Sequence, residues 1–344
     1  MIGMEKNRVW KVAILPGDGT GPELVDASMV VLNAVMKKFK IKMEIIFAEA
    51  GLHCIEKYGT NLPERTVDIL KKSDCVIKGP MTTPEGAGSQ VSAAVKIRKM
   101  FDLYADVRPA KTIPGVESLK PKIDMVIVRE NTEGMYSGLD FMVTKDMAVG
   151  LRVITREGSR RIGRFALELA RKRKKHLTIV HKGNILKVSD ALFKDTILKE
   201  AKNYKDVAVD DAHADAMAQW LIKNPQFYDV IVAENLFGDI LSDESSMIVG
   251  GIGTGPSANI GKDYAMFEPI HGSAPKYAGM DRANPIATIM SMKMMLDWMG
   301  YEKAALAVEE AVLKSIKEGI KTVDLGGSSK GMQVAKAIAS NILK

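Results

Sequence analysis

Short runs of apolar residues alternate with longer amphipathic segments along most of the chain. The runs WKVAIL (10–15), DMVIV (124–128), HLTIV (176–180) and YDVIVA (228–233) are as long as buried strands. Residues 21–39, 160–174 and 301–317 carry apolar side chains at helical spacing. Strands that alternate with helices predict an α/β fold with a largely parallel sheet.

One stretch departs from this alternation. Between Tyr136 and Glu157 the sequence is rich in Thr, Val, Met and Gly with weak polar–apolar alternation, which predicts a hairpin-like excursion. At 344 residues the chain also exceeds the size at which one hydrophobic core usually stops growing. We therefore expect two domains or one elaborated α/β domain.

Composition narrows the class of protein. No stretch reaches the roughly 18 apolar residues of a membrane span, and the first residues include no apolar run of signal-peptide length. The cysteines, Cys54 and Cys75, are too few for a disulfide framework and are not in metal-ligand spacing. We therefore expect inert thiols in a reducing compartment, and a cytoplasmic protein with no membrane partner.

The net charge of +7 suits either a nucleic-acid partner or an anionic small substrate. Basic residues are dispersed except for the run RKRKK at 171–175, which closes the helix predicted over 160–174. Because cations favour a helix C-terminus, we interpret this run as a solvated helix end. We expect no nucleic-acid partner and favour a small polyanionic substrate.

A glycine-rich loop, GDGTG at 17–21, follows the first predicted strand and precedes a helix. This context is typical of a phosphate-binding turn, but the spacing G-x-G-x-G differs from the dinucleotide-binding pattern G-x-G-x-x-G. A tight strand-to-helix turn alone also explains the glycines. The motif by itself leaves both explanations open, and we favour the tight turn.

Two aspartates, Asp239 and Asp243, lie four residues apart where a predicted strand runs into a predicted helix. They share one helical face, where like charges repel. Apolar neighbours such as Leu236 and Leu241 predict partial burial, in which paired carboxylates need a cation. Oxygen ligands favour Mg²⁺ or Mn²⁺ over Zn²⁺, and the alternative is an ordinary solvated acidic face.

Further charged residues are candidates for substrate binding and proton transfer. Arg98, Arg108 and Arg129 would form a polycarboxylate clamp if they shared one cleft, because guanidinium groups bind carboxylates through two hydrogen bonds. Isolated surface ion pairs are the alternative. Tyr136 and Lys182 are candidate proton carriers, since burial or a nearby charge can tune either group, although each taken singly suits a structural role.

Seven motifs in unbroken order carry a resemblance to a known family. They are GDGTGPE, KGPMTTP, FDLYADVRP, VRENTEGMYSG, VHKGNILK, ENLFGDILSDE and EPIHGSAPKYAGMDRANP. Together they resemble the β-decarboxylating dehydrogenases, which include isocitrate, homoisocitrate, 3-isopropylmalate and tartrate dehydrogenases. The resemblance implies a metal-dependent, NAD(P)-dependent enzyme that oxidises and decarboxylates a 2-hydroxy acid.

The resemblance also implies an α/β two-domain fold that is not Rossmann, with a central sheet and a clasp that joins two subunits. Residues 1–103 and 250–344 would form a large domain with the cofactor site, 104–135 and 157–249 a small domain, and 136–156 the clasp. The implied assembly is a homodimer with shared active sites, with a higher oligomer as an option. The loop at 17–21 then has no phosphate-binding role, because the family's cofactor lies against the region that matches EPIHGSAPKYAGMDRANP.

The family's site residues fall into groups. Substrate carboxylates would be bound by Ser92, Arg98, Arg108 and Arg129. Mg²⁺ or Mn²⁺ would be held by Asp239, Asp243 and, from the partner subunit, Asp215. Proton transfer would involve Tyr136, Lys182 and Asp215, of which Lys182, again from the partner, helps to remove the hydroxyl proton and Tyr136 protonates the enolate.

The implied cofactor residues are Thr82, Asn184, His271, Gly272, Ala274, Lys276, Tyr277, Asn284 and Asp324. Lys276 and Tyr277 stand where NAD-dependent members typically have Asp, and a cation beside a phenol suits the 2′-phosphate of NADP. Val323 and Gly327 occupy places where NADP-dependent members often have Tyr and Arg. We therefore expect NADP with measurable use of NAD, which is the alternative cofactor.

The stretch before Arg98 distinguishes substrates within the family. Isocitrate enzymes commonly have Ser-x-Asn there, and this chain has Ser92 but Ala94 in place of Asn, while the Leu-rich isopropylmalate pattern is absent. The motif RENTEGMYSG also resembles isocitrate enzymes, and together these features imply the oxidative decarboxylation of isocitrate to 2-oxoglutarate. Homoisocitrate is the second expected substrate, with Lys96 as a contact for its distal carboxylate, and 3-isopropylmalate is the third. Use of more than one substrate stays open, because a difference of one methylene changes the specificity of an enzyme only about 10- to 200-fold.

A different class of function is a non-catalytic regulatory subunit. Degraded metal or proton-transfer positions would mark such a chain. All five of these positions hold the expected residues, which are Tyr136, Lys182, Asp215, Asp239 and Asp243. The resemblance therefore favours a catalytic chain.

Overall fold

The computed structural model describes residues 8–86 and 88–344. The strands of its main sheet are β1 (Trp10–Leu15), β2 (Met43–Phe47), β3 (Cys75–Lys78), β4 (Ala105–Lys111), β5 (Asp124–Glu130), β8 (His176–His181), β9 (Ala208–His213), β10 (Val230–Ala233), β11 (Pro256–Ile260) and β12 (Ala265–Pro269). The α-helices are α1 (Gly21–Phe39), α2 (Leu52–Tyr58), α3 (Glu64–Lys72), α4 (Ala93–Met100), α5 (Arg156–Arg171), α6 (Ser189–Ala201), α7 (Ala214–Lys223), α8 (Asn235–Val249), α9 (Ile286–Trp298), α10 (Glu302–Lys317) and α11 (Gly331–Leu343).

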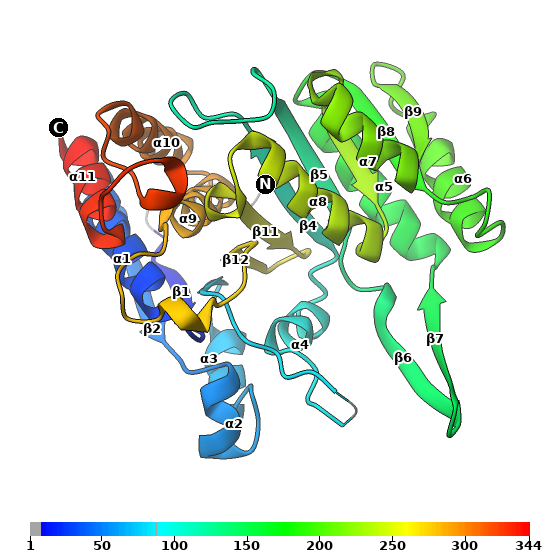
Figure 1. The fold of residues 1–344 in the computed structure, drawn as a ribbon, viewed down its shortest axis with the longest axis horizontal. Coiled ribbons are helices and arrows are strands. Elements are labelled where there is room, and N and C mark those ends of the chain that lie inside the picture. Colours follow the sequence, from blue (N-terminus) through cyan, green and yellow to red (C-terminus); the bar gives the residue numbers. More distant parts are fainter. Residues whose placement is uncertain (1–7, 87) are drawn as a thin grey trace.

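Within the described residues, ten strands form one sheet in the order β2-β1-β3-β12-β11-β4-β5-β10-β8-β9 (Figure 1). The strands on both flanks pair in parallel, as predicted. The centre does not, because β11 pairs antiparallel with β12 and β4, and β4 pairs antiparallel with β5. The prediction of a largely parallel sheet is therefore confirmed, but the antiparallel centre was not predicted. The short connection at 261–264 between β11 and β12 can join only antiparallel neighbours.

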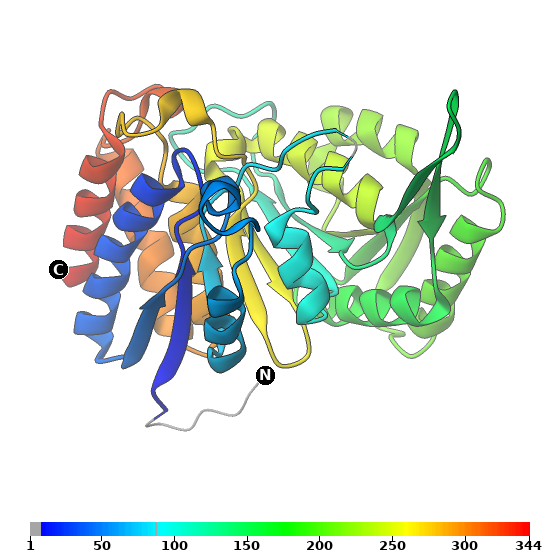
Figure 2. The same cartoon turned by 90° about the horizontal axis from the view of Figure 1, so that it is seen from below.

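Helices cover both faces of the sheet. Side chains alternate along β5, so Val126 and Val128 pack with the core under α5 and α6, while Met125 and Ile127 pack with the core under α7 and α8. Figure 2 shows these two helix pairs on opposite sides of their strands. Burial on both faces explains why residues 125–128 (MVIV) are all apolar rather than alternating with polar residues.

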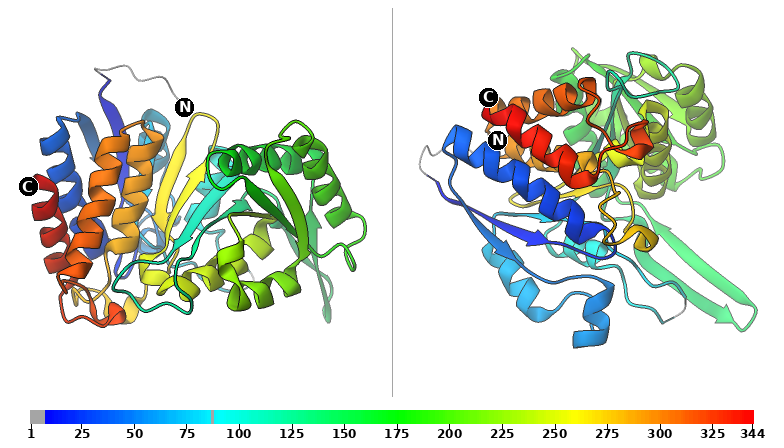
Figure 3. Two further views of the ribbon diagram at one scale, coloured as in Figure 1. Left: turned by 90° about the horizontal axis from the view of Figure 1, so that it is seen from above. Right: turned by 60° about the vertical axis from the view of Figure 1, so that its left-hand side comes forward.

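The other half of the sheet is covered in the same way. Helices α1, α9, α10 and α11 pack on one face, where Val12 and Ile14 belong to the largest apolar core (Figure 3). Ala13 and Leu15 of the same strand pack on the opposite face with Leu70 of α3. The α/β fold with a central sheet is confirmed, whereas the domain boundaries that we expect at 103/104, 135/136, 156/157 and 249/250 stay a prediction.

The predicted hairpin-like excursion is confirmed. Strands β6 (Gly134–Thr144) and β7 (Met147–Val153) pair antiparallel as a separate two-stranded sheet. The hairpin projects away from the rest of the chain (Figures 2 and 3). Many of its apolar side chains are exposed, among them Phe141 at 51% and Met142 at 61%.

The helix predicted over 160–174 is shifted in the structure. Helix α5 begins at Arg156, where the hydroxyl of Thr155 accepts the backbone N–H of Gly158, and ends at Arg171. The basic run at 171–175 begins at the last residue of α5 and is exposed at every position except Arg173, so the predicted solvated helix end is confirmed for the other four residues. Arg173 binds the carboxylates of Asp229 and Asp124 (2.7 and 2.8 Å), because the chain turns back toward β5 and β10 directly after α5.

Two further expectations concern the cysteines and the membrane. Cys54 and Cys75 are buried free thiols, and burial raises the pKa of Cys54 to about 11 and that of Cys75 still further, as expected of inert core residues. In the part of the chain that the structure describes, no helix combines the length and the apolar character that crossing a membrane requires.

Candidate functional site

Three buried arginines, here called the arginine cluster (Arg98, Arg108 and Arg129), come together near the centre of the sheet. Arg108 lies on β4 and Arg129 on the neighbouring strand β5, while Arg98 comes from α4. Their residues are only 8%, 6% and 1% exposed. This burial excludes the alternative of isolated surface ion pairs, because a buried guanidinium needs fixed polar partners.

Buried polar side chains bind Arg108 and Arg129 and fix their orientation. The fully buried carboxylate of Asp106 accepts a hydrogen bond from Nε of Arg108 (2.9 Å) and another from the hydroxyl of Ser257 (2.6 Å). Arg129 donates from Nε and Nη2 to the amide oxygen of Asn235 (2.9 and 2.7 Å). Burial, together with the positive charge of Arg108, lowers the pKa of Arg129 to about 10, so it stays charged at neutral pH.

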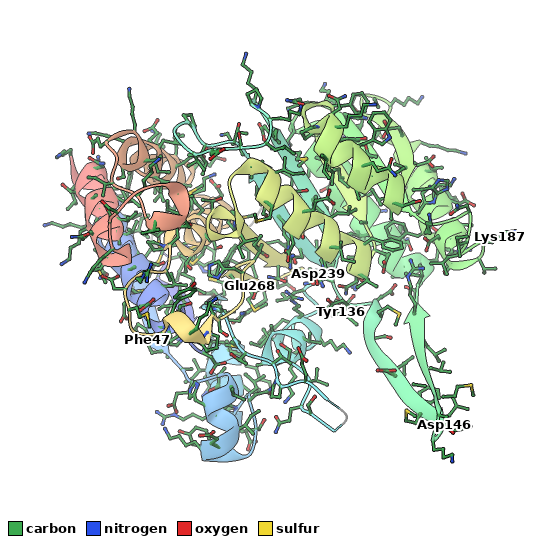
Figure 4. The ribbon with its side chains drawn as sticks, viewed as in Figure 1. Phe47, Tyr136, Asp146, Lys187, Asp239 and Glu268 are labelled. Atoms are coloured by element: carbon green, nitrogen blue, oxygen red, sulfur yellow. The ribbon has the colours of Figure 1, made fainter. Side chains whose placement is uncertain are left out.

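The free ends of two arginines point at Asp239 on α8. Its carboxylate accepts hydrogen bonds from Nη1 of Arg129, from Nη1 of Arg108 (3.0 Å) and from the hydroxyl of Tyr136 (2.6 Å; Figure 4). Burial favours the neutral acid, but Arg129 and Arg108 outweigh it and lower the pKa of Asp239. Asp239 is therefore a carboxylate at the meeting point of the cluster.

Asp243 lies one helical turn further along α8. Its carboxylate is 3.4 Å from Nη1 of Arg108, yet partial burial raises its pKa, and the charge of Asp239 adds to this increase. A cation between the two carboxylates would relieve both effects, and their oxygen atoms suit Mg²⁺ or Mn²⁺. Asp239 and Asp243 can thus supply two ligands to a metal, which fits the expected role.

In the part of the chain that the structure describes, a third protein ligand does not lie beside these two. Within residues 8–86 and 88–344, no group of three His, Cys, Asp or Glu side chains is placed to hold a metal ion. Asp215, the expected third ligand, lies at the start of α7 and forms an ion pair with Lys182 (2.5 Å). One chain therefore contributes two separate sets of ligands, as a site shared between two subunits would require.

The pair of Lys182 and Asp215, here called the lysine pair, is more exposed than the arginine cluster. Lys182 follows the end of β8, and its side chain is 25% exposed, while that of Asp215 is 64% exposed. The hydrogen bond from Lys182 lowers the pKa of Asp215. In the described ranges no hydrogen bond or ion pair joins this pair to Asp239 or Asp243.

Tyr136 has the environment of a proton donor. It lies on β6 at the base of the hairpin, and its ring faces the guanidinium of Arg129, whose carbon is 4.8 Å from the ring centre. Burial raises the pKa of its hydroxyl, and the hydrogen bond to Asp239 supports the same direction. The phenol is therefore protonated at neutral pH and directed at the centre of the cluster.

A second buried ion cluster was missed by the sequence analysis. Glu268 on β12 binds Lys78 (2.7 Å) and Arg98 (3.0 Å), and all three residues are less than 10% exposed. Lys78 and Arg98 outweigh the effect of burial and hold the pKa of Glu268 well below its usual range. The signal was present, since a lysine and a glutamate each interrupt an apolar strand, but only the pairing of Ile77 with Phe267 places them side by side.

The expected cofactor residues gather partly in one place. The hydroxyl of Thr82 is 2.6 Å from that of Ser273, and the amide of Asn284 donates to Asp324 (2.9 Å). His271 and Gly272 begin the same loop, and burial lowers the pKa of the His271 imidazole. Asn184 lies apart, exposed in the turn that carries Lys182, and so belongs with the lysine pair.

Three further cofactor candidates lie at the exposed tip of this loop. Ala274 has a left-handed backbone (φ 39°) and precedes the short helix η3 (Pro275–Tyr277). Within η3, the ammonium of Lys276 lies 4.8 Å from the ring centre of Tyr277. The cation and the phenol thus stand side by side in solvent, where a phosphate could reach them.

The glycine loop at 17–21 is a tight structural turn. A Cβ atom on Gly17 would come within 2.2 Å of the carbonyl oxygen of Pro80, and one on Gly19 within 2.2 Å of that of Ser273. Asp18 accepts the backbone N–H groups of Leu52 and Thr82, both at 2.9 Å. Close backbone packing therefore accounts for the glycines, as we favoured.

Residues expected to face the variable part of the substrate lie at the start of α4. Ser92 is the N-cap residue of α4, and its side chain makes no capping hydrogen bond. The ammonium of Lys96 donates to the amide oxygen of Asn61 (2.7 Å) and lies 3.4 Å from that of Gln90. Because both acceptors are neutral, they hold Lys96 in place without neutralising its charge.

Comparisons with known proteins agree with this architecture. The family model for isocitrate/isopropylmalate dehydrogenase matches residues 11–340. The chain is 44% identical over 332 residues to a 3-isopropylmalate dehydrogenase of Archaeoglobus fulgidus, covering 96% of this chain and 98% of that protein. It is 42% identical over 331 residues to an isocitrate/homoisocitrate dehydrogenase of Thermus thermophilus, covering 96% and 97%.

A solved structure extends the agreement to the fold. The isocitrate dehydrogenase of Methylococcus capsulatus superposes with a TM-score of 0.94 at 40% sequence identity, over 98% of this chain and 100% of that one. The family match, the extent of these relatives and the shared fold lead to one conclusion. This chain belongs to the isocitrate/isopropylmalate dehydrogenase family.

Proposed function

We propose that this dehydrogenase oxidises and decarboxylates a small 2-hydroxy acid with several carboxylates, isocitrate first and homoisocitrate second. The observation that carries the proposal is the arginine cluster directed at Asp239 beside Tyr136. In the structure, Arg108 and Arg129 bind the carboxylate of Asp239. Substrate carboxylates offer the same geometry and charge, so the cluster is suited to bind them.

The start of α4 supports a further carboxylate on the substrate. Among the described residues, Lys96 has neutral hydrogen-bond partners and no carboxylate in an ion pair, and the Ser92 side chain makes no capping hydrogen bond. A polar wall of this kind suits isocitrate or homoisocitrate better than an isopropyl group. 3-Isopropylmalate is the third candidate substrate, and it is supported by the similarity to the Archaeoglobus relative, which is named 3-isopropylmalate dehydrogenase.

The chain's own residues would carry the proton transfers. Lys182 of the partner subunit would take up the hydroxyl proton of the substrate, close to a carboxylate that keeps its amine oriented. Tyr136 would deliver a proton to the carbon that loses CO₂, since its phenol is held protonated at the arginine cluster. The arginines would fix the substrate between these two groups.

A metal and a nicotinamide cofactor complete the proposed chemistry. Mg²⁺ or Mn²⁺ at Asp239 and Asp243, with the partner's Asp215, would polarise the substrate oxygens and stabilise developing negative charge. We infer a preference for NADP over NAD, because Lys276 and Tyr277 are exposed side by side where a 2′-phosphate can be bound.

We further propose a homodimer in which each active site uses both subunits. The support is an apolar surface on α7, α8 and the hairpin, which includes Trp220, Ile240, Met247 and Phe141, each more than 40% exposed. Exposed apolar side chains that gather on neighbouring elements are typical of contact surfaces. A second copy placed there could bring its lysine pair to the arginine cluster. The buried reduced thiols also support a cytoplasmic enzyme.

One assay tests the substrate proposal. Purified protein with Mg²⁺ and each cofactor is given isocitrate, homoisocitrate or 3-isopropylmalate, and kcat/KM is compared. We expect the highest value for isocitrate and the lowest for 3-isopropylmalate. A higher value for 3-isopropylmalate than for isocitrate would show that the polar residues at α4 do not determine the choice.

A further inference from the structure

Arg152, on β7 at the base of the hairpin, is a largely enclosed cation that the proposed mechanism does not use. Its side chain is 12% exposed and lies between the carboxylates of Asp190 and Glu234, each only 1% exposed. Its Nη2 donates to Asp190, its Nη1 lies 3.3 Å from the hydroxyl of Ser189, and its Nε lies 3.4 Å from Glu234. Two buried carboxylates thus depend on one guanidinium for neutralisation.

Asp190 connects Arg152 to Lys182. Asp190 lies in the first turn of α6, and its second carboxylate oxygen accepts the backbone N–H of Lys182 (2.5 Å). The side chain of Lys182 then reaches Asp215. A shift of the Asp190 carboxylate therefore moves the backbone that carries the proposed proton acceptor.

The other carboxylate, Glu234, depends less on Arg152. Glu234 is the N-cap residue of α8 and accepts the backbone N–H groups of Phe237 (3.0 Å) and Leu236 (3.3 Å). These bonds hold it in place from its own helix. Arg152 makes its hydrogen bonds to α6 and only a longer ion pair to Glu234, so loss of Arg152 should displace Lys182 more than α8.

We propose that Arg152 is a positioning residue that acts through Asp190 on Lys182, and thereby on the active site of the partner subunit. The inference rests on the proposed function, in which Lys182 serves the partner's site while Asp239 and Tyr136 serve their own. Removing Arg152 should lower kcat by roughly 10- to 100-fold, because misplacement of a catalytic group by about an ångström has that effect. KM for the substrate should change little, since the arginine cluster is untouched.

The test uses hybrid dimers purified through two different affinity tags. In one hybrid, Arg152→Met is on one chain and Tyr136→Phe on the other. In the second hybrid, both substitutions are on the same chain and the other chain is unchanged. If Arg152 acts on the partner's site, the first hybrid keeps one intact site and about half the parent's kcat per dimer. The second hybrid then has one site without Tyr136 and one with a displaced Lys182, and is nearly inactive.

A reference pair of hybrids replaces Arg152→Met by Lys182→Met. We expect the same pattern from it, active when the substitutions are on different chains and inactive when they are together. The opposite pattern in the reference pair would overturn the shared site and both proposals. A different result is that the Lys182 hybrids behave as expected while the two Arg152 hybrids show the opposite difference in activity, or none. That result would overturn the Arg152 proposal alone, since Arg152 would then act on its own chain's site or on neither.

Further variants separate positioning from folding. Arg152→Lys keeps the positive charge and should recover part of kcat. This variant also serves as the test if Arg152→Met fails to fold. Arg171→Met removes an arginine that pairs with Asp206 at the surface and should leave kcat at the parent's value. A fully folded Arg152→Lys and a fully folded Arg152→Met that both retain the parent's kcat would overturn the proposal.

Discussion

The arginine cluster and the lysine pair are both groups of opposite charges, yet the molecule builds them in opposite ways. The arginines are almost fully buried, and Asp106 and Asn235 accept hydrogen bonds from Arg108 and Arg129, respectively. Lys182 and Asp215 pair with each other in partial contact with solvent. The arginines therefore have fixed polar partners within the fold. Lys182 is positioned by its backbone, which donates to Asp190, the partner of Arg152.

This difference in burial predicts that substitutions in the arginine cluster affect both stability and function, whereas substitutions in the lysine pair affect mainly function. Breaking a buried ion cluster leaves an uncompensated charge inside the protein, so its residues support the fold as well as the site. An exposed pair adds little to stability. Residues at the lysine pair are therefore free to serve a second subunit, and substitutions in the two regions should differ in what they damage.

The largest effect is expected at the meeting point of the arginine cluster. Asp239→Asn removes a negative charge that Arg108, Arg129 and Tyr136 all contact, and a metal ligand under the proposed function. We expect kcat to fall by roughly 100- to 1,000-fold, as when one preorganised electrostatic group is removed from an active site. Steady-state kinetics with saturating Mg²⁺ measure it.

The matched control is Asp263→Asn, an exposed aspartate in the turn between β11 and β12. It should behave like the parent. Activity of Asp239→Asn close to that of the parent would show that the cluster is structural only, and would remove the main support for the metal site.

The next effect is a loss of stability, which compares a buried ion cluster with the exposed lysine pair. Glu268→Gln leaves Lys78 and Arg98 buried without a carboxylate, and should lower the free energy of unfolding by about 3 kcal/mol. Asp215→Asn, in the exposed lysine pair, should change it only slightly. Urea unfolding at neutral pH measures both.

The pH dependence of this loss has a definite sign. The folded protein holds the pKa of Glu268 well below its usual value of 4.5, so its stabilising effect is complete above that value. As the pH falls below 4.5, this contribution is progressively lost. The difference in unfolding free energy between the parent and Glu268→Gln should therefore shrink in acid, and a difference that stayed constant would contradict the pairing.

A smaller effect is expected from the exposed cofactor loop, which resembles the lysine pair in its exposure. Lys276→Asp combined with Tyr277→Ile removes the cation and the phenol and adds a repulsive carboxylate. The ratio of kcat/KM for NADP to that for NAD should fall by roughly 10- to 100-fold, with stability unchanged. Lys303→Asp on α10 is the charge-matched control. A parent enzyme that already prefers NAD would refute the assignment of the phosphate site.

The smallest effect is expected at α4. Ala94→Asn restores the amide of the Ser-x-Asn pattern beside Ser92, and one added hydrogen bond should raise kcat/KM for isocitrate by roughly 5-fold. The isosteric control is Ala94→Leu, which should not help isocitrate. If Ala94→Asn gives no gain, the pocket recognises its substrate through other groups, with Lys96 as the first to examine.

Much of the architecture could be read from local patterns. Helix α1 spans 21–39 as predicted, and the runs at 10–15 and 176–180 lie in β1 and β8, because apolar periodicity reports burial directly. The hairpin was predicted from its composition. The antiparallel centre was not, because strand direction depends on which strands pair, and a pattern of apolar residues is the same in either direction.

The candidate site also has features that local sequence predicts and features that depend on long-range packing. The sequence by itself determined the family, and its ordered motifs predicted the residues that would bind substrate, metal and cofactor, because such motifs preserve residue types at set positions. Only the tertiary structure decided how those residues are supported. The contacts of Glu268 with Lys78, and of Arg152 with Asp190, join residues far apart in the chain. Such pairings follow from strand register and helix packing, and these are set by long-range burial that no local pattern records.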